Sequence, residues 1–380
     1  MRTVTRFASV AVIAAAALAG VASPASASAA PRAADWTGGG AVFVQTDNTS
    51  GNVIVAYRRA RDGGLSPAGQ YPTGGLGGIL AGSQVDHLAS QGSLTFDAQA
   101  GTLFAVNAGS NTVSVFGVHG TTLYLRQVIG SGGTFPVSVA VSGDLVYVLN
   151  ALDGGELQGY VLTSGRLAAL PGSGRPLGLD PSATPQFTNT PGQVAFTPDG
   201  AEVVVTTKAN GSDIDVYQVR GDGYLSADPV VNSEPGAVPF AIAFDRAGHL
   251  VIAEAGTDAL ATFAVSPAGT ASLLDEAGTG EQATCWVAPA HGFLYASNAA
   301  SASVSGFSDN LNGSLALLAS TATDPGTVDA SATPGGRFLY VQTGGDGIVD
   351  EFSVAPSGAL SQIGSVTVPG AAGGEGIVAA

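Results

Sequence analysis

The sequence is poor in the residues that most often build disulfides, metal sites and nucleophiles. Among 380 residues it has one cysteine, one methionine, four histidines and a single lysine. One cysteine excludes an internal disulfide, so the fold has to be held together by its core. His-Glu-x-x-His, paired cysteines, Gly-x-Ser-x-Gly and EF-hand loops are absent. No motif therefore supports a metal site, a cofactor or a serine nucleophile.

Positive charge is scarce as well. The chain carries 13 Lys and Arg against 29 Asp and Glu, a formal net charge of −16. This balance argues against a nucleic-acid partner, because few side chains are left to neutralise phosphates. After the first 29 residues no apolar run approaches the ~20 residues that span a bilayer. We expect a small-molecule ligand or substrate as the partner, no membrane span and a monomeric protein.

The N-terminus has the pattern of a secretory signal peptide over residues 1–29. Arg2 and Arg6 give a basic start, the run from Phe7 to Ala22 is apolar or small, and Ala27–Ala29 offers a small-residue cleavage site. We therefore expect a secreted protein. Residues 30–40, rich in Ala, Pro and Gly, are expected to be a short flexible lead-in to one domain over residues 41–380.

Residues 41–380 contain a sevenfold repeat of short apolar segments separated by glycine turns. Seven aromatic residues mark it at intervals of roughly 45 residues, two of them longer. These are Tyr57, Phe116, Tyr160, Tyr217, Phe263, Phe307 and Phe352. Such a period predicts an all-β fold, a seven-bladed β-propeller with four antiparallel strands in each blade. In the fourth repeat we expect the outer strand to begin at Tyr224.

The first repeat lacks an inner strand, and the end of the chain can supply it. Gly374–Ala379 is similar to the other inner strands, so we predict that it pairs with Val42–Gln45 and closes the ring. The two longer repeats carry insertions at residues 72–92 and 171–191. Each follows an outer strand. It therefore lies on the face that also carries the turns between second and third strands, which we call the top face.

Several short segments resemble the lactonase-type seven-bladed propellers, which include bacterial 6-phosphogluconolactonase-like and carboxymuconate-cyclase-like proteins. The segments are Ser90–Leu94, Asn107–Asn111, Phe196–Gly200, Thr207–Asn210, Glu254–Gly256 and Cys285–Val287. The resemblance covers nearly all of residues 41–380. It implies this fold and either lactone hydrolysis or a cyclase- or isomerase-like reaction. Members of that group act on intracellular phosphorylated or carboxylated lactones, whereas export and few basic residues favour a small extracellular lactone or related ring here.

The polar residues that end the second strands should form a ring on the top face. They are Thr46, Asn107, Asn150, Lys208, Glu254, Asn298 and Thr343. Lys208 and Glu254 are the two charged members and are neighbours. They are either an ion pair between blades or a catalytic pair, in which Lys208 holds a lactone oxygen and Glu254 moves a proton. Asn107, Asn150 and Asn298 either donate further hydrogen bonds to a substrate or cap turns.

Other candidates lie in the insertions and near the channel mouth. His87, next to Asp86, is the one histidine in a top loop and is either a general base or a solvated loop residue. Arg175 could bind a ligand anion. Gln91, Gln193 and Glu375 begin inner strands.

The leading hypothesis is a metal-independent lactone hydrolase with Glu254, Lys208 and His87 as catalytic residues. The alternative is a non-catalytic secreted propeller that binds a small ligand or a cell-envelope partner on the same face.

Overall fold

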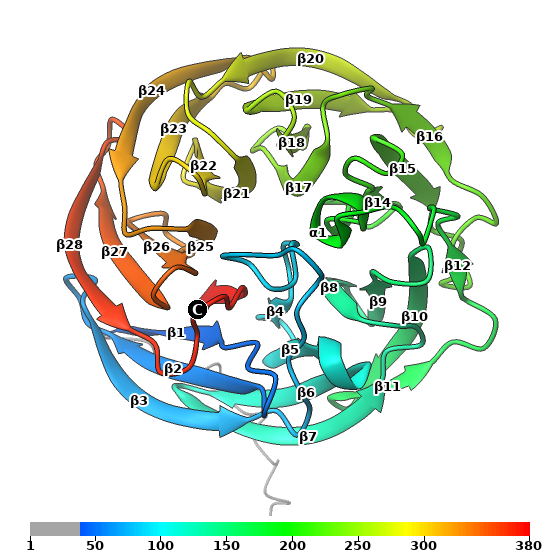
Figure 1. Cartoon of the computed structure of the whole chain (residues 1–380), viewed down its shortest axis with the longest axis horizontal. Helices are drawn as coiled ribbons and strands as arrows, with labels where there is room; N and C mark the ends of the chain where they lie inside the picture. Colours follow the sequence, from blue (N-terminus) through cyan, green and yellow to red (C-terminus); the bar gives the residue numbers. More distant parts are fainter. Residues whose placement is uncertain (1–38) are drawn as a thin grey trace, which may run out of the picture. The chain divides into compact units, whose positions relative to one another are not determined.

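The computed structural model describes residues 39–380, so the expected signal peptide and most of the lead-in lie outside the described residues. Seven antiparallel sheets are arranged around a common centre (Figure 1). Each sheet is one blade with four strands, which run in sequence order from the centre outward except in the first blade, where the last strand of the chain is innermost; the third blade has a short extra strand. The predicted seven-bladed β-propeller is confirmed.

The first four blades are numbered by the order in which their second strands occur. Their strands, from the centre outward, are as follows: β29 (Ile377–Ala379), β1 (Gly40–Gln45), β2 (Val53–Arg59) and β3 (Leu65–Pro72); β4 (Leu94–Asp97), β5 (Thr102–Asn107), β6 (Thr112–His119) and β7 (Thr122–Gly130); β8 (Pro136–Ser142), β9 (Leu145–Asn150), β10 (Glu156–Thr163) and β11 (Arg166–Ala169), with β12 (Arg175–Pro176) on β10; and β13 (Val194–Phe196), β14 (Glu202–Thr206), β15 (Asp213–Gln218) and β16 (Val230–Ser233).

The last three blades follow the same order. They contain β17 (Pro239–Phe244), β18 (Leu250–Glu254), β19 (Ala259–Val265) and β20 (Ala271–Gly278); β21 (Thr284–Ala290), β22 (Phe293–Asn298), β23 (Ser303–Asp309) and β24 (Leu315–Ala322); and β25 (Thr327–Ala332), β26 (Phe338–Thr343), β27 (Ile348–Val354) and β28 (Leu360–Thr367). Two short helices complete the described elements, a 3₁₀ turn at Ala108–Ser110 and α1 at Gln186–Asn189.

The C-terminal strand closes the ring, as the sequence predicts. β29 pairs antiparallel with β1, placing Ile377 opposite Val44 and Ala379 opposite Val42. The backbones of Ala41 and Ala380 exchange two further hydrogen bonds, of 3.1 and 2.8 Å. Inner strands contact their neighbours all the way round, including β25 against β29 and β29 against β4. Closure leaves the first blade with no unpaired inner edge, which would otherwise be open to association.

The core lies between the blades, which is why the second strands are continuous apolar runs. Every residue of β1, β5 and β26 is buried. The repeat aromatics on the third strands are at most 1% exposed. Second-strand tyrosines add hydrogen bonds to the next blade, where the hydroxyl donates to the carbonyl of a turn glycine: Tyr147 to Gly223 (2.8 Å), Tyr295 to Gly358 (2.8 Å) and Tyr340 to Gly63 (2.7 Å). Each of these glycines, which a leucine follows two residues later, lies in the turn before the outer strand, so these turns also join neighbouring blades.

The fourth blade departs from the sequence prediction. Its outer strand begins at Val230 instead of Tyr224, and Leu225 forms only an isolated bridge with Val219. The carbonyls of Leu225 and Ser226 are taken by the guanidinium of Arg175, at 2.9 and 2.8 Å. A strand ladder would need these groups, so the ladder starts later.

Within residues 39–380 the structure contains no helix with the length and hydropathy needed to cross a membrane.

Candidate functional site

The first insertion crosses the centre of the ring and fills the top of the channel (light blue in Figure 1). Its segment 86–91 is hydrogen-bonded to blades 3, 4 and 6 and to the segment that leads into β29. The indole of Trp286 in blade 6 donates to the carbonyl of Ser90 at 2.7 Å, and the hydroxyl of Ser90 donates to the carbonyl of Val137 in blade 3 at 3.0 Å. The backbone N–H of His87 donates to Gly373 at 2.8 Å. The insertion is therefore an internal plug of the channel instead of a free loop.

Two glutamines expected at the channel mouth hold this arrangement. The amide of Gln91 bridges the ring to Val287, donating to its carbonyl at 3.1 Å and accepting from its N–H at 3.0 Å. The side-chain oxygen of Gln193 accepts the N–H of Ile242 at 2.5 Å. Both side chains hydrogen-bond to the backbone of inner strands in other blades.

Lys208 is buried and ties the two insertions together. Its ammonium donates to the carbonyls of Ala89 (2.6 Å) and Phe187 (2.7 Å) and to the hydroxyl of Thr190 (3.2 Å). It also lies 5.1 Å from the centre of the Phe240 ring. All three donors are used by the protein, and burial lowers the pKa of the amine to about 7, partly offset by the charge of Asp86. In this structure Lys208 holds the plug.

Glu254 and Lys208 are neighbours in the ring but do not form the expected ion pair within the described residues. Pro239, at the start of β17, lies between them: it accepts the backbone N–H of Lys208 at 3.2 Å and pairs with Glu254 in the sheet. The carboxylate of Glu254 accepts from the hydroxyl of Thr257 at 3.0 Å. The two charges therefore act in separate environments.

The environment of Glu254 favours the neutral carboxylic acid. The residue is 3% exposed. Burial raises the pKa of the carboxyl to about 7, and the negative charges of Glu276 and Glu234 raise it further. A carboxyl with a pKa near neutrality can exchange a proton with a bound substrate at physiological pH. Whether Glu254 acts as a catalytic residue stays a prediction.

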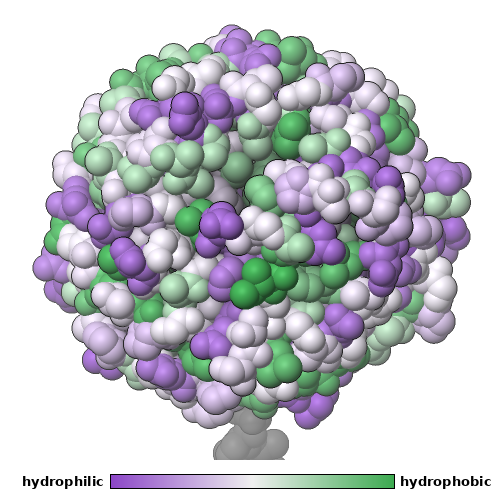
Figure 2. Space-filling view, in the orientation of Figure 1, coloured by the Kyte–Doolittle hydropathy of each residue, from purple (hydrophilic) through white to green (hydrophobic). Residues whose placement is uncertain are grey.

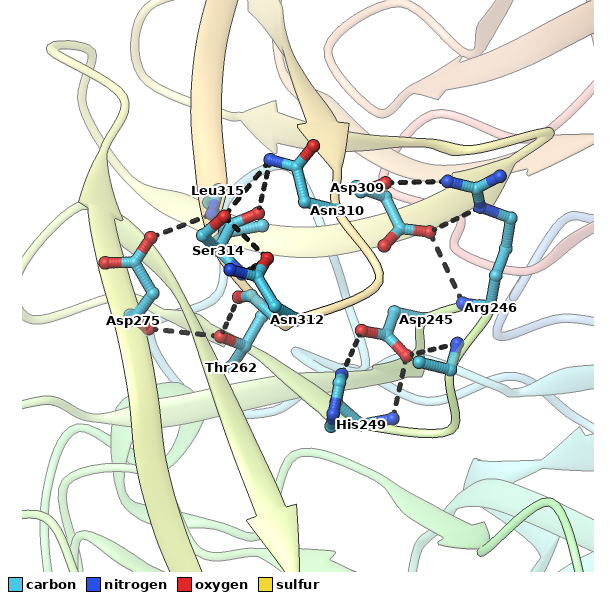
Figure 3. Close-up of polar contacts among 12 residues, drawn as sticks. Asp245, Arg246, His249, Thr262, Asp275, Asp309, Asn310, Asn312, Ser314 and Leu315 are labelled. Carbon is cyan, nitrogen blue, oxygen red and sulfur yellow. Dashed lines mark hydrogen bonds and ion pairs between the residues drawn. The ribbon is translucent and has the colours of Figure 1, made fainter.

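His87 and Asp86 do not form a catalytic pair. The carboxylate of Asp86 accepts the N–H groups of Leu88 (2.8 Å) and Ser90 (3.0 Å), so it shapes its own loop. The His87 ring packs against Gly373, Nδ1 is buried without a partner, and burial lowers the ring's pKa. An aspartate–histidine contact does occur on the opposite face, where Asp245 and His249 approach to 2.6 Å beside an Arg246–Asp309 ion pair (Figure 3). The Arg246–Asp309 pair links blades 5 and 6, whereas the Asp245–His249 contact lies within the first-to-second strand turn of blade 5.

The three asparagines of the ring use their side-chain amides on neighbouring protein groups. The amides of Asn107 and Asn298 donate to hydroxyls of the following turn and strand: Thr112 and Ser114 for the first, Ser303 and Ser305 for the second. Asn150 donates to the carbonyls of Ser131 and Glu156. Arg175 lies apart from this ring, because β12 pairs with β10 and its guanidinium binds backbone carbonyls.

Four buried carboxyls gather at the plug, one of them within it, a feature that the sequence reasoning missed. They belong to Asp47, Asp86, Asp329 and Glu375, and burial raises the pKa of each: to about 8, about 6 and about 7 for the three aspartates, and well above its ordinary value for Glu375. The sequence feature that could have revealed this cluster is Asp329, an acidic residue in the inner strand β25, whose other residues are small or apolar. Among residues 39–380 no three Asp, Glu, His or Cys side chains are grouped to hold a metal ion.

The top face as a whole has no broad polar or apolar patch, since residues of both kinds are interspersed over it (Figure 2). A small cavity there, of about 20 Å³, lies between the Leu152–Gly154 turn and the second insertion. Any ligand on this face therefore meets a surface formed by the insertions.

Comparison with known families agrees with this architecture. The family model described as "Lactonase, 7-bladed beta-propeller" matches residues 77–373. The chain belongs to the lactonase family of seven-bladed β-propellers. The resemblance drawn from the short segments is thereby confirmed, and the match includes residues 77–92 of the first insertion, the whole second insertion and the ring residues from Asn107 to Thr343.

Solved structures similar to this lactonase-family chain share its fold at low identity. A putative 6-phosphogluconolactonase from Bacteroides fragilis has a TM-score of 0.71 and 19% identity, covering 91% of this chain and 99% of that one. The periplasmic gluconolactonase of Pseudomonas aeruginosa has a TM-score of 0.69 and 19% identity, covering 89% and 98%. Virginiamycin B lyase from Staphylococcus aureus is more distant, with a TM-score of 0.54 and 12% identity, covering 77% and 90%. A search of curated proteins finds no significant match.

Proposed function

We propose that this lactonase-family protein hydrolyses a small, uncharged lactone on its top face, with Glu254 as the general base. The observation that carries the proposal is the pKa of the Glu254 carboxyl, raised to about 7 by burial and by two neighbouring glutamates. Ester hydrolysis needs a base that is partly ionised at the working pH, to take a proton from water. Membership of the lactonase family supplies the reaction class.

The charges near Glu254 support an uncharged substrate. Glu234 and Glu276 both act on its carboxyl, and the ammonium of Lys208 is committed to backbone carbonyls. A phosphorylated or carboxylated lactone would add a further negative charge without a cation to meet it. An aldonolactone without such groups, for example glucono-δ-lactone, fits this environment better. We also propose an extracellular location, supported by the signal-peptide pattern of residues 1–29.

The test is turnover by the purified protein and by Glu254→Gln. We expect the wild-type rate of ring opening to rise with pH through about 7, as the Glu254 carboxyl ionises. The Glu254→Gln variant should lose about 100-fold or more in rate with an unchanged melting temperature. Asp228→Asn, at an exposed carboxylate that does not act on the Glu254 carboxyl, is the control and should keep most of the activity. Equal rates for wild type and Glu254→Gln would contradict the role of Glu254.

A second candidate is a non-catalytic binding propeller, and one observation favours it. The plug fills the channel, and the single lysine is fully hydrogen-bonded. No free cation on the plug is therefore left to stabilise the oxyanion that forms during ring opening. If the wild-type protein opens none of a panel of neutral, phosphorylated and carboxylated lactones faster than buffer, the hydrolase proposal fails and the binding function takes its place.

A further inference from the structure

A cavity of about 720 Å³ opens on the bottom face, where blades 7, 1 and 2 meet. It lies at the end of the closing strand β29, opposite the face that carries Glu254, and is lined by the first-to-second and third-to-fourth strand turns of these blades. Its size is in the range of small-molecule sites, ~300–1,000 Å³. The arguments below are independent of the proposed hydrolase function.

The lining of this cavity gathers positive charge in an acidic protein. Arg59, Arg61 and Arg337 line it, three of the 13 basic residues of a chain with net charge −16. Phe96 and Phe338 contribute apolar surface. Ala379 of β29 and the adjacent Ala380 also contribute to the lining. Because a net negative charge repels anions, such a concentration of arginine favours anions locally, at this cavity.

Arg59 is positioned by the closure of the ring. It is the last residue of β2 and pairs with Gly40, the first residue of β1. The space that a Cβ of Gly40 would occupy is taken by the guanidinium of Arg59 and the carbonyl of Ala380. The Nε atom of Arg59 is buried and has no hydrogen-bond partner. A buried donor without a partner is uncommon, because leaving it unsatisfied is costly.

Arg337 completes the arrangement from blade 7. Its guanidinium carbon lies 5.5 Å from the centre of the Phe338 ring, which orients the planar group at the cavity wall. Within residues 39–380, neither Arg59 nor Arg337 forms an ion pair. The two guanidinium groups can donate hydrogen bonds to an anionic group, and the two aromatic rings beside them can contact the apolar part of the same molecule.

We propose that this bottom cavity binds a small organic anion, whose carboxylate or phosphate is held by Arg59 and Arg337 and whose apolar part lies on Phe96 and Phe338. Guanidinium groups match both oxyanions with paired hydrogen bonds, so the two chemistries share one site. Nothing in the site is placed for a covalent step, and the cavity therefore acts as a binding site.

The experiment is calorimetric titration of the purified protein with four probes: phenyl phosphate, benzoate, inorganic phosphate and phenol. We expect phenyl phosphate or benzoate to bind more tightly than inorganic phosphate, and phenol not to bind. The stronger of the two organic anions identifies the preferred oxyanion. Absence of binding by both at millimolar concentration would overturn the proposal. So would equal binding of phenol, which would show that the arginines contribute nothing.

Variants locate the site. Arg337→Gln and Arg59→Gln should each weaken binding by about tenfold or more, since each removes a charged hydrogen-bonding group. Arg166→Gln is the matched control, because Arg166 is an exposed arginine in the corresponding turn of blade 3 and does not line the cavity. Affinity reduced equally in all three variants would indicate only general attraction and refute the site. If Arg59→Gln fails to fold, the exposed Arg337 decides alone.

Discussion

The four buried carboxyls at the plug should make this protein more stable in mild acid than at neutral pH. Asp47, Asp86, Asp329 and Glu375 all have a higher pKa in the folded protein than in an unfolded chain, chiefly because burial disfavours their charged forms. Between the two values the folded state holds more protons. Stability is therefore greatest below the unfolded pKa of about 4 and falls as pH rises towards about 8.

The size of the effect follows from the number of groups. One pKa unit in one group corresponds to about 1.4 kcal/mol. Four shifted carboxyls together should therefore change the free energy of unfolding by several kcal/mol, against a typical total of about 5–15 kcal/mol. Lys208 acts in the opposite direction but in a higher window, because its lowered pKa gives stability that is lost as pH falls from 10.5 to about 7. The interval from pH 4 to 7 thus reports the carboxyls.

Glu375→Gln isolates the contribution of one member. The Glu375 side chain accepts a hydrogen bond from Ser90 at 3.3 Å, while its Oε1 has no partner. A neutral amide of the same shape removes the charge that the site disfavours, so the variant should be more stable than wild type at pH 7.5 and should show a weaker pH dependence. The assay is urea unfolding at pH 5 and pH 7.5, followed by fluorescence of the buried Trp286. Asp228→Asn, an exposed acid, is the control and should behave as wild type.

Two outcomes would refute the reasoning. One is an unfolding midpoint of the wild-type protein that is equal or higher at pH 7.5 than at pH 5. The other is a Glu375→Gln variant that is less stable than wild type at pH 7.5, which would mean that the carboxylate is satisfied by an interaction stronger than its burial cost.

Three further predictions concern the contacts between blades. Deletion of residues 374–380 should remove β29 and its hydrogen bonds to β1 and lower the melting temperature of the whole domain, and an unchanged temperature would show that closure adds no stability. Lys208→Met should leave the carbonyls of Ala89 and Phe187 without a donor, cost about 1–3 kcal/mol and speed hydrogen exchange in both insertions; protection equal to wild type would contradict its bracing role. Tyr340→Phe should cost about 1 kcal/mol in urea unfolding by removing one bond between blades 7 and 1, and a larger loss would point to repacking instead.

The sequence predicts the fold more completely than the site because the two depend on different kinds of contact. Strand positions follow from local runs such as Val203–Thr207, and closure follows from the missing first strand of the first repeat. Strand positions and ring closure can both be inferred by aligning each segment with the equivalent segment of the other repeats. The outer strand of blade 4 was misplaced because Arg175, some 50 residues away, captures the carbonyls involved. No local pattern announces such a contact.

The same limit explains the candidate site. The ring position of Lys208 is correct, but its role depends on Ala89 and Phe187, which reach it from two insertions of unpredicted shape. A buried lysine whose donors are all met by protein carbonyls and a hydroxyl holds neighbouring segments together, whereas the same residue in an open channel would hold a substrate oxygen. Sequence alone does not separate these two, since the difference lies in whether residues 86–91 enter the channel.

The plug also relates the two faces of the molecule. Residues 86–91 are hydrogen-bonded to Trp286 and Val287, whereas the cavity around Arg59 opens on the bottom face, so the two proposed sites lie on opposite faces. Proton exchange at Glu254 and anion binding at Arg59 and Arg337 can then be removed one at a time. Loss of turnover in Glu254→Gln with anion binding intact, and the reverse in Arg337→Gln, is the result that this separation requires. A change in both functions from either substitution would mean that the plug transmits an effect between the faces.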